Sequence, residues 1–160
     1  MTIEESIEAA LFGRVKSLDL SLAHAIAWPN VDFTKDSALG NAGAGWAMGD
    51  ESPAFLIGNP DQPYIRVQHL PNVNTRLFMK GSNPHQRMGI LQLTVVGKLL
   101  VGPTIGTRAA GEIAAHFPAD LALYGEGVRV RITQSPTVAA AEKADTSWNV
   151  RVDVPYEAFA

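Results

Sequence analysis

The sequence predicts an α+β fold in which two helices pack on one side of a mostly antiparallel sheet of about four to five strands. Apolar residues recur every three or four positions in two segments, as on one face of a helix. In several other segments they alternate with polar residues, as on one face of a half-buried strand. Helix, strands, helix, strands is the resulting order, which is typical of a layer of helices on a sheet.

The first helix is predicted over residues 3–18, where one stripe is formed by Ile3, Ile7, Leu11, Val15 and Leu18. Thr2 and Glu5 have the spacing of a capping box at its start. The second helix is predicted over residues 104–117, with Thr104 as its N-cap. Its many alanines and glycines permit close approach to a sheet or another helix.

Strands are predicted at residues 24–28, 64–70, 75–79, 90–96, 128–132 and 148–154. The strand at 90–96 is partly apolar on both faces, so we expect it at the centre of the sheet. Residues 81–89 are expected to form a polar loop before it. Residues 1–160 are interpreted as one domain with an inserted Gly-rich loop or arm at about 34–63, because loops of that length are uncommon and usually functional or disordered.

Composition excludes several classes of protein. The net charge is −3 and acidic and basic residues are interspersed, which argues against a nucleic-acid binder with clustered lysines and arginines. The chain has no cysteine, which removes disulfides, thiolate nucleophiles and cysteine zinc sites. The start of the chain is acidic, unlike a signal peptide, and the uncharged run at 88–97 is too short to cross a membrane. A soluble protein without a membrane partner is expected.

Sequence motifs for catalysis are weak. None of the four histidines has helical zinc spacing, and no G-x-S-x-G motif occurs. The GKLLVGPT segment at 97–104 has Pro103 where a phosphate loop needs its lysine. We therefore predict no enzyme, no catalytic residue, no metal and no cofactor. A small hydrolase that uses His85 or His69 remains the alternative from a different class.

Basic residues on the polar side of the predicted strands suggest an interface. They are Arg66, Arg129, Arg131 and Arg151. A solvated sheet face is the plainer interpretation. The sharper one is a subunit interface, where arginine is enriched because its planar guanidinium pairs with carboxylates of a neighbour.

Two segments carry a family resemblance. PYIRVQHLPN at 63–72, followed by GSNPHQRMGILQLTVVG at 81–97, resembles the tail terminator (tail completion) proteins of long-tailed bacteriophages, related to the lambda-type minor tail terminator. AWPN at 27–30 with Phe33, the alanine-rich helix that ends in Phe117, and the valine-rich closing strand are similar to the same family. The Gly-rich interval at 34–63 is longer than the family pattern suggests.

The resemblance implies a structural virion protein of the tail and neck, assembled in the host cytoplasm. Six copies would form a ring that caps the head-proximal end of the tail tube and stops its polymerisation. The ring would join the tail to the head connector. Its implied partners are further copies of itself, the tail tube protein and a connector or stopper protein, with genomic DNA passing through the lumen without sequence readout. Another neck component, such as a stopper, is the alternative within this class.

A ring of identical subunits needs two different patches on each subunit. The predicted loop with Asn83, His85 and Arg87, together with the four arginines, is our candidate for one patch. The exposed acids of the first helix are the candidate for the other: Glu4, Glu5 and Glu8. Trp46, in the 34–63 loop, is included as a further contact residue.

Overall fold

The computed structural model describes residues 1–21, 25–29, 64–98, 103–144 and 147–160. In chain order the elements are α1 (Ile3–Lys16), β1 (Ala25–Ala27), β2 (Tyr64–Pro71), β3 (Thr75–Arg76), β4 (His85–Lys98), α4 (Thr104–His116), β5 (Ala122–Gly125), β6 (Val128–Ile132), β7 (Thr137–Val138), β8 (Glu142–Lys143) and β9 (Ser147–Phe159). The 34–63 loop and Trp46 lie outside the described residues, so their predicted roles stay predictions.

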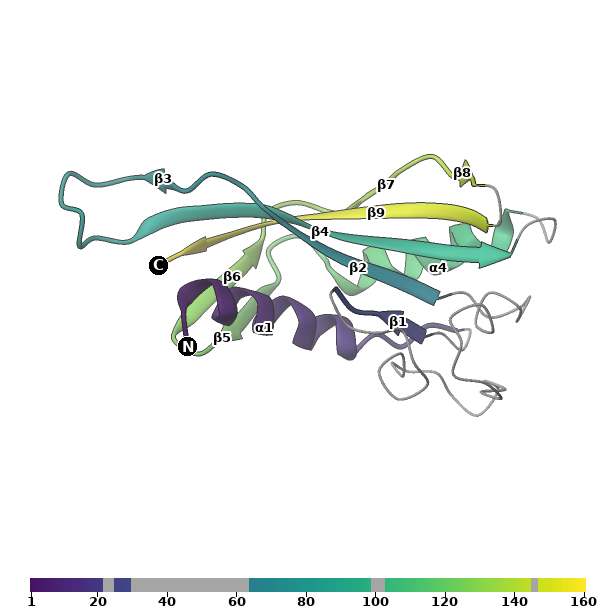
Figure 1. The fold of residues 1–160 in the computed structure, drawn as a ribbon, viewed down its shortest axis with the longest axis horizontal. Coiled ribbons are helices and arrows are strands. Elements are labelled where there is room, and N and C mark those ends of the chain that lie inside the picture. The colour runs from purple at the N-terminus through teal and green to yellow at the C-terminus, as the bar shows by residue number, and fades with distance from the viewer. Residues whose placement is uncertain (22–24, 30–63, 99–102, 145–146) are drawn as a thin grey trace.

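The described strands form one curled mixed sheet (Figure 1). Its order is β1-β2-β4-β9-β6-β5, with β3 on β4 and with β7 and β8 on β9. β1 and β2 run parallel, whereas the other pairs are antiparallel. The predicted sheet of four to five mostly antiparallel strands is therefore wrong: the described part of the chain has nine strands and two helices. Strands of two to four residues carry too little alternation to be seen in a sequence.

The pairing of β4 with β9 is the longest in the described part of the sheet. It runs through thirteen residue pairs, from Gln86 opposite Phe159 to Lys98 opposite Ser147. β4 lies between β2 and β9, which confirms the prediction of a central strand. It begins at His85, however, so the predicted loop at 81–89 is wrong in its second half. Pairing with β9 extends the strand into residues whose own pattern is polar.

Helix α1 has the predicted capping box, in which Thr2 Oγ1 accepts a hydrogen bond from the Glu5 amide at 3.3 Å and Glu5 in turn accepts from the Thr2 amide. It packs against β5 and β6, where the sheet curls beside it (Figure 1). Gly125 makes this approach possible, because a Cβ there would lie 2.1 Å from the carbonyl oxygen of Ser6. The β5 strand that carries Gly125 was absent from the sequence prediction.

Helix α4 packs against β9 and β4. The prediction of Thr104 as N-cap is wrong, because Thr104 is the first helical residue and Pro103 occupies the cap without a side-chain hydrogen bond. Gly106 allows the predicted close packing: a Cβ there would lie 3.1 Å from Val150 Cγ2 of β9.

One core joins the inner face of the sheet to both helices. Its fully buried side chains include Leu11, Val15, Ile65, Leu91, Leu93, Val95, Ile113, Phe117, Val130, Ile132, Val152 and Val154. β2 and β6 show the alternating burial that their sequences predict. The arginines of these strands are consequently on the exposed side.

Residues 72–84, hereafter the arm, project from one end of the sheet (Figure 1). The arm consists of β3, paired through Thr75 with Gln86 and through Arg76 with His85, and the turn that follows. In Figure 1 it extends beyond α1 and beyond the rest of the described fold. It contributes no residue to the core.

Candidate interaction surfaces

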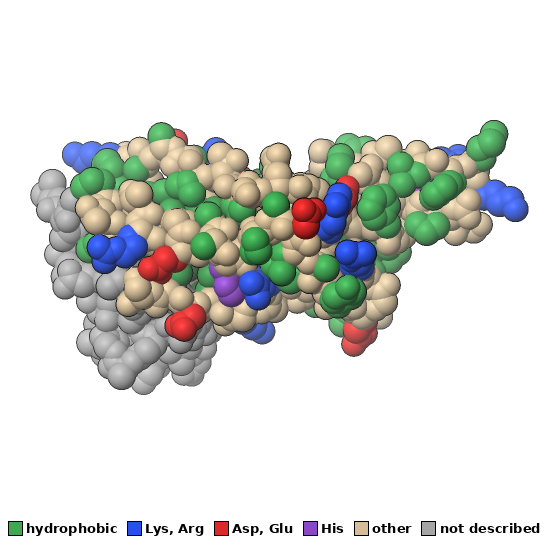
Figure 2. All heavy atoms as spheres, turned by 180° about the vertical axis from the view of Figure 1, so that it is seen from behind, with side chains coloured by type: hydrophobic (Ala, Val, Ile, Leu, Met, Phe, Trp, Pro, Cys, Tyr) green, Lys and Arg blue, Asp and Glu red, His purple; other side chains and the backbone are tan. Residues whose placement is uncertain are grey.

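The arm exposes an apolar cluster. The exposed fractions are 81% for Val73, 44% for Leu77, 52% for Phe78 and 95% for Met79. Figure 2 shows hydrophobic side chains gathered over the projecting end of the molecule, with basic side chains among them. Scattered apolar residues on a surface are ordinary, but a contiguous apolar cluster on a projecting element is typical of a protein contact site.

The turn of the arm is held by Arg76. Its Nε donates to the carbonyl oxygen of Phe78 at 2.8 Å, and its Nη2 donates to that of Met79. One guanidinium therefore holds the backbone of two of the exposed apolar residues, Phe78 and Met79. Because the turn is already ordered, less conformational entropy would be lost when a partner binds it.

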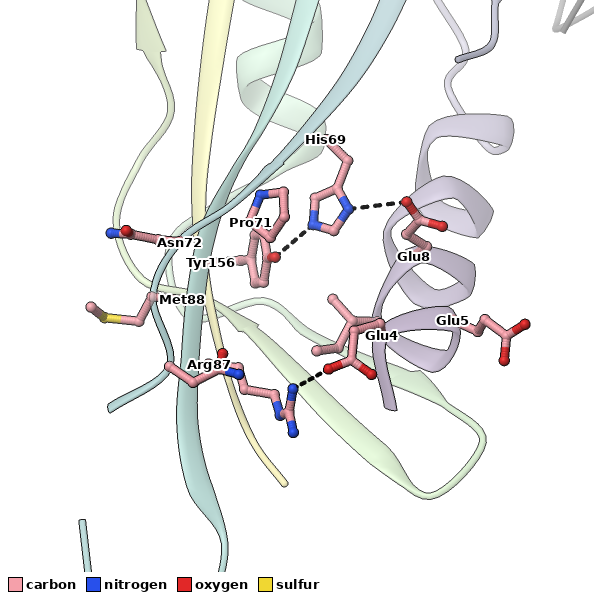
Figure 3. Close-up of a pocket in the computed structure, with 11 residues that line it drawn as sticks. Glu4, Glu5, Glu8, His69, Pro71, Asn72, Arg87, Met88 and Tyr156 are labelled. Carbon is pink, nitrogen blue, oxygen red and sulfur yellow. Dashed lines mark hydrogen bonds and ion pairs between the residues drawn. The ribbon is translucent and has the colours of Figure 1, made fainter. Parts of the chain in front are cut away.

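A pocket of about 270 Å³, hereafter the α1 pocket, lies between α1 and the sheet at the root of the arm (Figure 3). Side chains that line it include Glu4, Ile7, Glu8, His69, Arg87 and Tyr156. Small-molecule sites are usually 300–1,000 Å³. The α1 pocket is therefore better suited to one or two side chains than to a cofactor.

Tyr156, His69 and Glu8 form a hydrogen-bonded chain in the α1 pocket (Figure 3). The Tyr156 hydroxyl lies 2.6 Å from His69 Nε2, and His69 Nδ1 lies 3.2 Å from Glu8 Oε1. Burial, and secondarily the charge of Glu8, raise the pKa of Tyr156 to about 12. Tyr156 therefore keeps its proton. When the proton of the imidazole is on Nδ1, Nε2 accepts from the Tyr156 hydroxyl and Nδ1 donates to Glu8. This chain ties α1 to β2 and β9.

Gly89 is required by the same arrangement. A Cβ at Gly89 would lie 2.6 Å from the Tyr156 hydroxyl oxygen and 2.8 Å from the carbonyl oxygen of Leu70. Any larger residue would displace Tyr156 from His69.

Arg87 and Glu4 form an ion pair between β4 and α1 (Figure 3). The sequence suggested them as members of two complementary patches on different subunits, but the structure brings them together in one chain. Glu8 is engaged with His69. Glu5, whose pKa is lowered by its hydrogen bonds with Thr2, points away from the sheet and is the acid of α1 open to a partner (Figure 3).

The other residues of the predicted loop are divided between the arm and β4. The Asn83 amide donates to the carbonyl oxygen of Lys80 within the turn at 3.2 Å. His85 is half-buried at the start of β4, and its amide donates to the carbonyl oxygen of Ala160 at 2.9 Å. Asn83 thus belongs to the arm and His85 to its root.

Arg66 and Arg151 lie on the outer face of the sheet on either side of Thr94, which is the register partner of both. They line a hollow of about 170 Å³ together with Gln92 and Asn149. Arg151 Nε lies 3.2 Å from Asp153 Oδ2, so part of its charge is neutralised within the chain.

Arg129 and Arg131 line a different hollow, of about 460 Å³, with the exposed ring of Phe159. Arg131 Nε donates to Glu157 Oε1 at 2.9 Å, and Glu157, which is 7% exposed, also accepts from Gln86 Nε2 at 3.0 Å. Among the described residues, the side chain of Arg129 has no hydrogen bond or ion pair. Arg151 is six residues from Glu157 along β9, roughly 20 Å, so the four arginines form two surfaces rather than one.

The two histidines of the enzyme alternative lie apart. His69 is opposite Leu91, six residues along β4 from His85, which corresponds to roughly 20 Å. In the parts of the chain that the structure describes, no three His, Asp or Glu side chains converge as metal ligands would. No helix among these residues is long and apolar enough to cross a membrane.

Sequence reasoning missed the exposed apolar cluster of the arm. The available signal was the LFM run at 77–79, three consecutive apolar residues in a stretch from Asn72 to Arg87 that is otherwise polar apart from Val73 and Pro84. It was assigned to a strand, where apolar residues are expected to be buried. The role of Tyr156 had no signal, because its partners lie 87 and 148 positions earlier.

Comparison with known proteins identifies the family of this chain. No curated protein matches the chain. One solved structure covers 99% of this chain, and 96% of its own length, at a TM-score of 0.66 and 21% identity, which shows a shared fold. The family model described as phage tail terminator protein matches residues 57–156, a segment that includes β2, the arm, β4, α4 and most of β9. The chain therefore belongs to the phage tail terminator family, as its sequence predicted.

Proposed function

We propose that this protein, a structural component of the phage tail, assembles into a ring of six copies that caps the head-proximal end of the tail tube. The ring stops tube polymerisation and joins the tail to the head connector or stopper protein. Membership of the tail terminator family supports a tail role. The observation that carries the assembly itself is the arm, which exposes four apolar side chains on an element outside the core.

A closed ring needs a heterologous interface, with two different patches on each subunit. The described surface offers patches of different chemistry: the apolar and basic arm, the α1 pocket, and the two arginine-lined hollows. A net charge of −3 suits a lumen through which DNA passes without being held, since tight DNA binding depends on clustered phosphate contacts.

Ring formation is tested by mass photometry and negative-stain images of the purified protein. We expect rings of six subunits with a central opening. A protein that stays monomeric at high micromolar concentration would contradict the proposal.

Capping is tested with tail tube protein that polymerises in vitro. Added ring protein is expected to bind one end of the tubes and to arrest their growth. A ring that binds the head connector but leaves tube growth unchanged would instead assign the protein to the stopper role.

A hydrolase is distinguished from a ring protein by replacement of His69 and His85 with alanine. The ring proposal expects this variant to change only in assembly. Any turnover of ester or phosphoester substrates that disappears in the variant would support the enzyme alternative.

A further inference from the structure

The exposed apolar side chains of the arm need a partner. Residues 70–82 are all exposed, and Met79 keeps 95% of its accessible surface. A two-stranded ribbon is at best marginally stable in water, and this one gains nothing from the core. Aromatic and methionine side chains are enriched at the centres of protein interfaces, where their burial supplies most of the binding free energy. Phe78 and Met79 therefore have the character of interface anchors.

The α1 pocket matches the arm in size and charge. Its mouth carries Glu4, Glu5 and Glu8 against one cation, Arg87, which leaves a charge of −2 when His69 is neutral. The arm carries Arg76 and Lys80 and no acid, a charge of +2. Among the described residues, the side chain of Lys80 has no hydrogen bond or ion pair. Opposite charges favour encounter and fix the orientation of docking.

Geometry excludes the two simpler arrangements. The base of the arm lines the pocket of its own chain through Asn72 and Asn74, but Phe78 and Met79 do not line it, and the tip of the arm extends away from α1 (Figure 1). Two arms that docked on each other would bring like charges together, which disfavours a symmetric contact. From Asn72 to Met79 an extended chain spans roughly 20 Å, enough to cross onto a neighbouring subunit.

We propose that the arm of one copy inserts Phe78 and Met79 into the α1 pocket of the next copy. This inference rests on the proposed ring and names the contact that closes it. The tip of the arm and the pocket are different surfaces of one subunit, so the contact is heterologous and repeats around a ring. Lys80 then lies near the carboxylates of α1, and Arg76 holds the turn in the shape that docks.

Cysteine cross-linking tests the contact directly, because the natural chain has no cysteine. We expect Met79→Cys/Glu8→Cys to form, under mild oxidation, a disulfide ladder that ends at the number of subunits in the ring. Met79→Cys alone and Glu8→Cys alone are expected to give no ladder. The matched control is Met79→Cys/Val138→Cys, since Val138 is exposed on β7 away from the pocket. A ladder in this control equal to that of the test pair, or none in either, overturns the contact.

Mixing two defective variants tests its direction. Phe78→Ser/Met79→Ser removes the anchors but keeps the pocket, while Glu8→Arg obstructs the pocket and reverses a charge but keeps the arm. Each variant alone is expected to remain monomeric. Each lost anchor should raise the dissociation constant of the subunit contact by about 30-fold. When the two variants are mixed, the intact arm of Glu8→Arg can dock in the intact pocket of Phe78→Ser/Met79→Ser, but the remaining arm and pocket are both defective and cannot pair. We therefore expect heterodimers by mass photometry, and no rings.

Three outcomes separate this inference from the proposed function. Rings from the Phe78→Ser/Met79→Ser variant would overturn the arm contact and leave the ring standing; if these rings no longer capped tubes, the arm would be assigned to the tube protein. If the natural chain made no ring while Met79→Cys/Glu8→Cys still cross-linked, the ring would be overturned and the contact kept. If the natural chain made no ring and the double-cysteine variant did not cross-link, both would be overturned. Val138→Ser, which removes an exposed apolar side chain elsewhere, is expected to assemble normally.

Discussion

Hydrogen bonds in both directions between Arg14 and His116 join the C-terminal ends of α1 and α4. Arg14 Nε and Nη2 donate to the carbonyl oxygen of His116 at 3.1 and 2.7 Å, and His116 Nε2 donates to the carbonyl oxygen of Arg14 at 3.0 Å. Burial, opposed by this last bond and assisted by the charge of Arg14, lowers the pKa of His116. The neutral imidazole is therefore the form that the folded state favours.

This depressed pKa predicts how stability depends on pH. Below the ordinary histidine pKa of about 6.5 the unfolded chain binds a proton that the folded chain resists, so acidification favours unfolding. Stability from this residue is complete above about pH 6.5 and falls as the pH decreases toward the lowered folded pKa. We expect the melting temperature to decrease from pH 7 to pH 5, and to decrease less in His116→Gln. Parallel profiles for the two proteins would show that other groups control this range.

For single residues, the sequence could indicate which side chains lie on the polar face of a strand, but not which side chains they pair with. The outward direction of Arg131 followed from alternation, and its exposure to solvent confirms it. Its pairing with Glu157 could be suggested only from charge, because it depends on the register of β6 on β9, which brings together residues 26 positions apart. The pairing of Arg87 with Glu4 joins positions 83 residues apart, and no local pattern encodes it.

Among the elements, α1 and β5 approach so closely that a glycine is needed between them. In Gly125→Ala the new methyl group would meet backbone atoms of Ser6, which cannot rotate away, so α1 must shift. We expect a loss of about 1–3 kcal/mol in the free energy of unfolding, the usual cost of an overpacked contact. Chemical denaturation measures it.

Gly111→Ala is the matched control for this prediction. Gly111 is exposed on α4, and a Cβ there meets nothing within 4 Å. The same change of side chain should stabilise the protein by about 0.5–1 kcal/mol, because alanine favours the helix. If both variants were destabilised equally, close approach at Gly125 would not be the cause.

Helices, and the central parts of the long strands, could be predicted because each carries its own periodicity, but β4 begins five residues before its predicted start and β9 ends five residues after its predicted end. Helix α1 begins at the predicted residue, where the capping box specifies its start. Short elements could not: β7 and β8 have two residues each and exist through pairing with β9. The parallel pairing of β1 with β2 depends on a connection that no local pattern describes.

On the scale of the whole molecule, one core joins both helices to the sheet, and the prediction of one domain can be tested through it. Leu93 is fully buried in the central strand. Leu93→Ala should cost about 2–5 kcal/mol. If the chain is one cooperative unit, circular dichroism and tryptophan fluorescence should report a single, coincident transition at lower denaturant concentration. Two separated transitions would indicate independently folding parts.

The arm contributes no residue to the core, which has an evolutionary consequence. Its residues carry none of the packing that keeps the chain folded, so selection can rewrite them without destabilising the scaffold. Changes at the tip would then be matched only by changes at whatever surface receives it. Related phages could in this way diverge into subunits that no longer co-assemble during a mixed infection, while the sheet and helices remain the same.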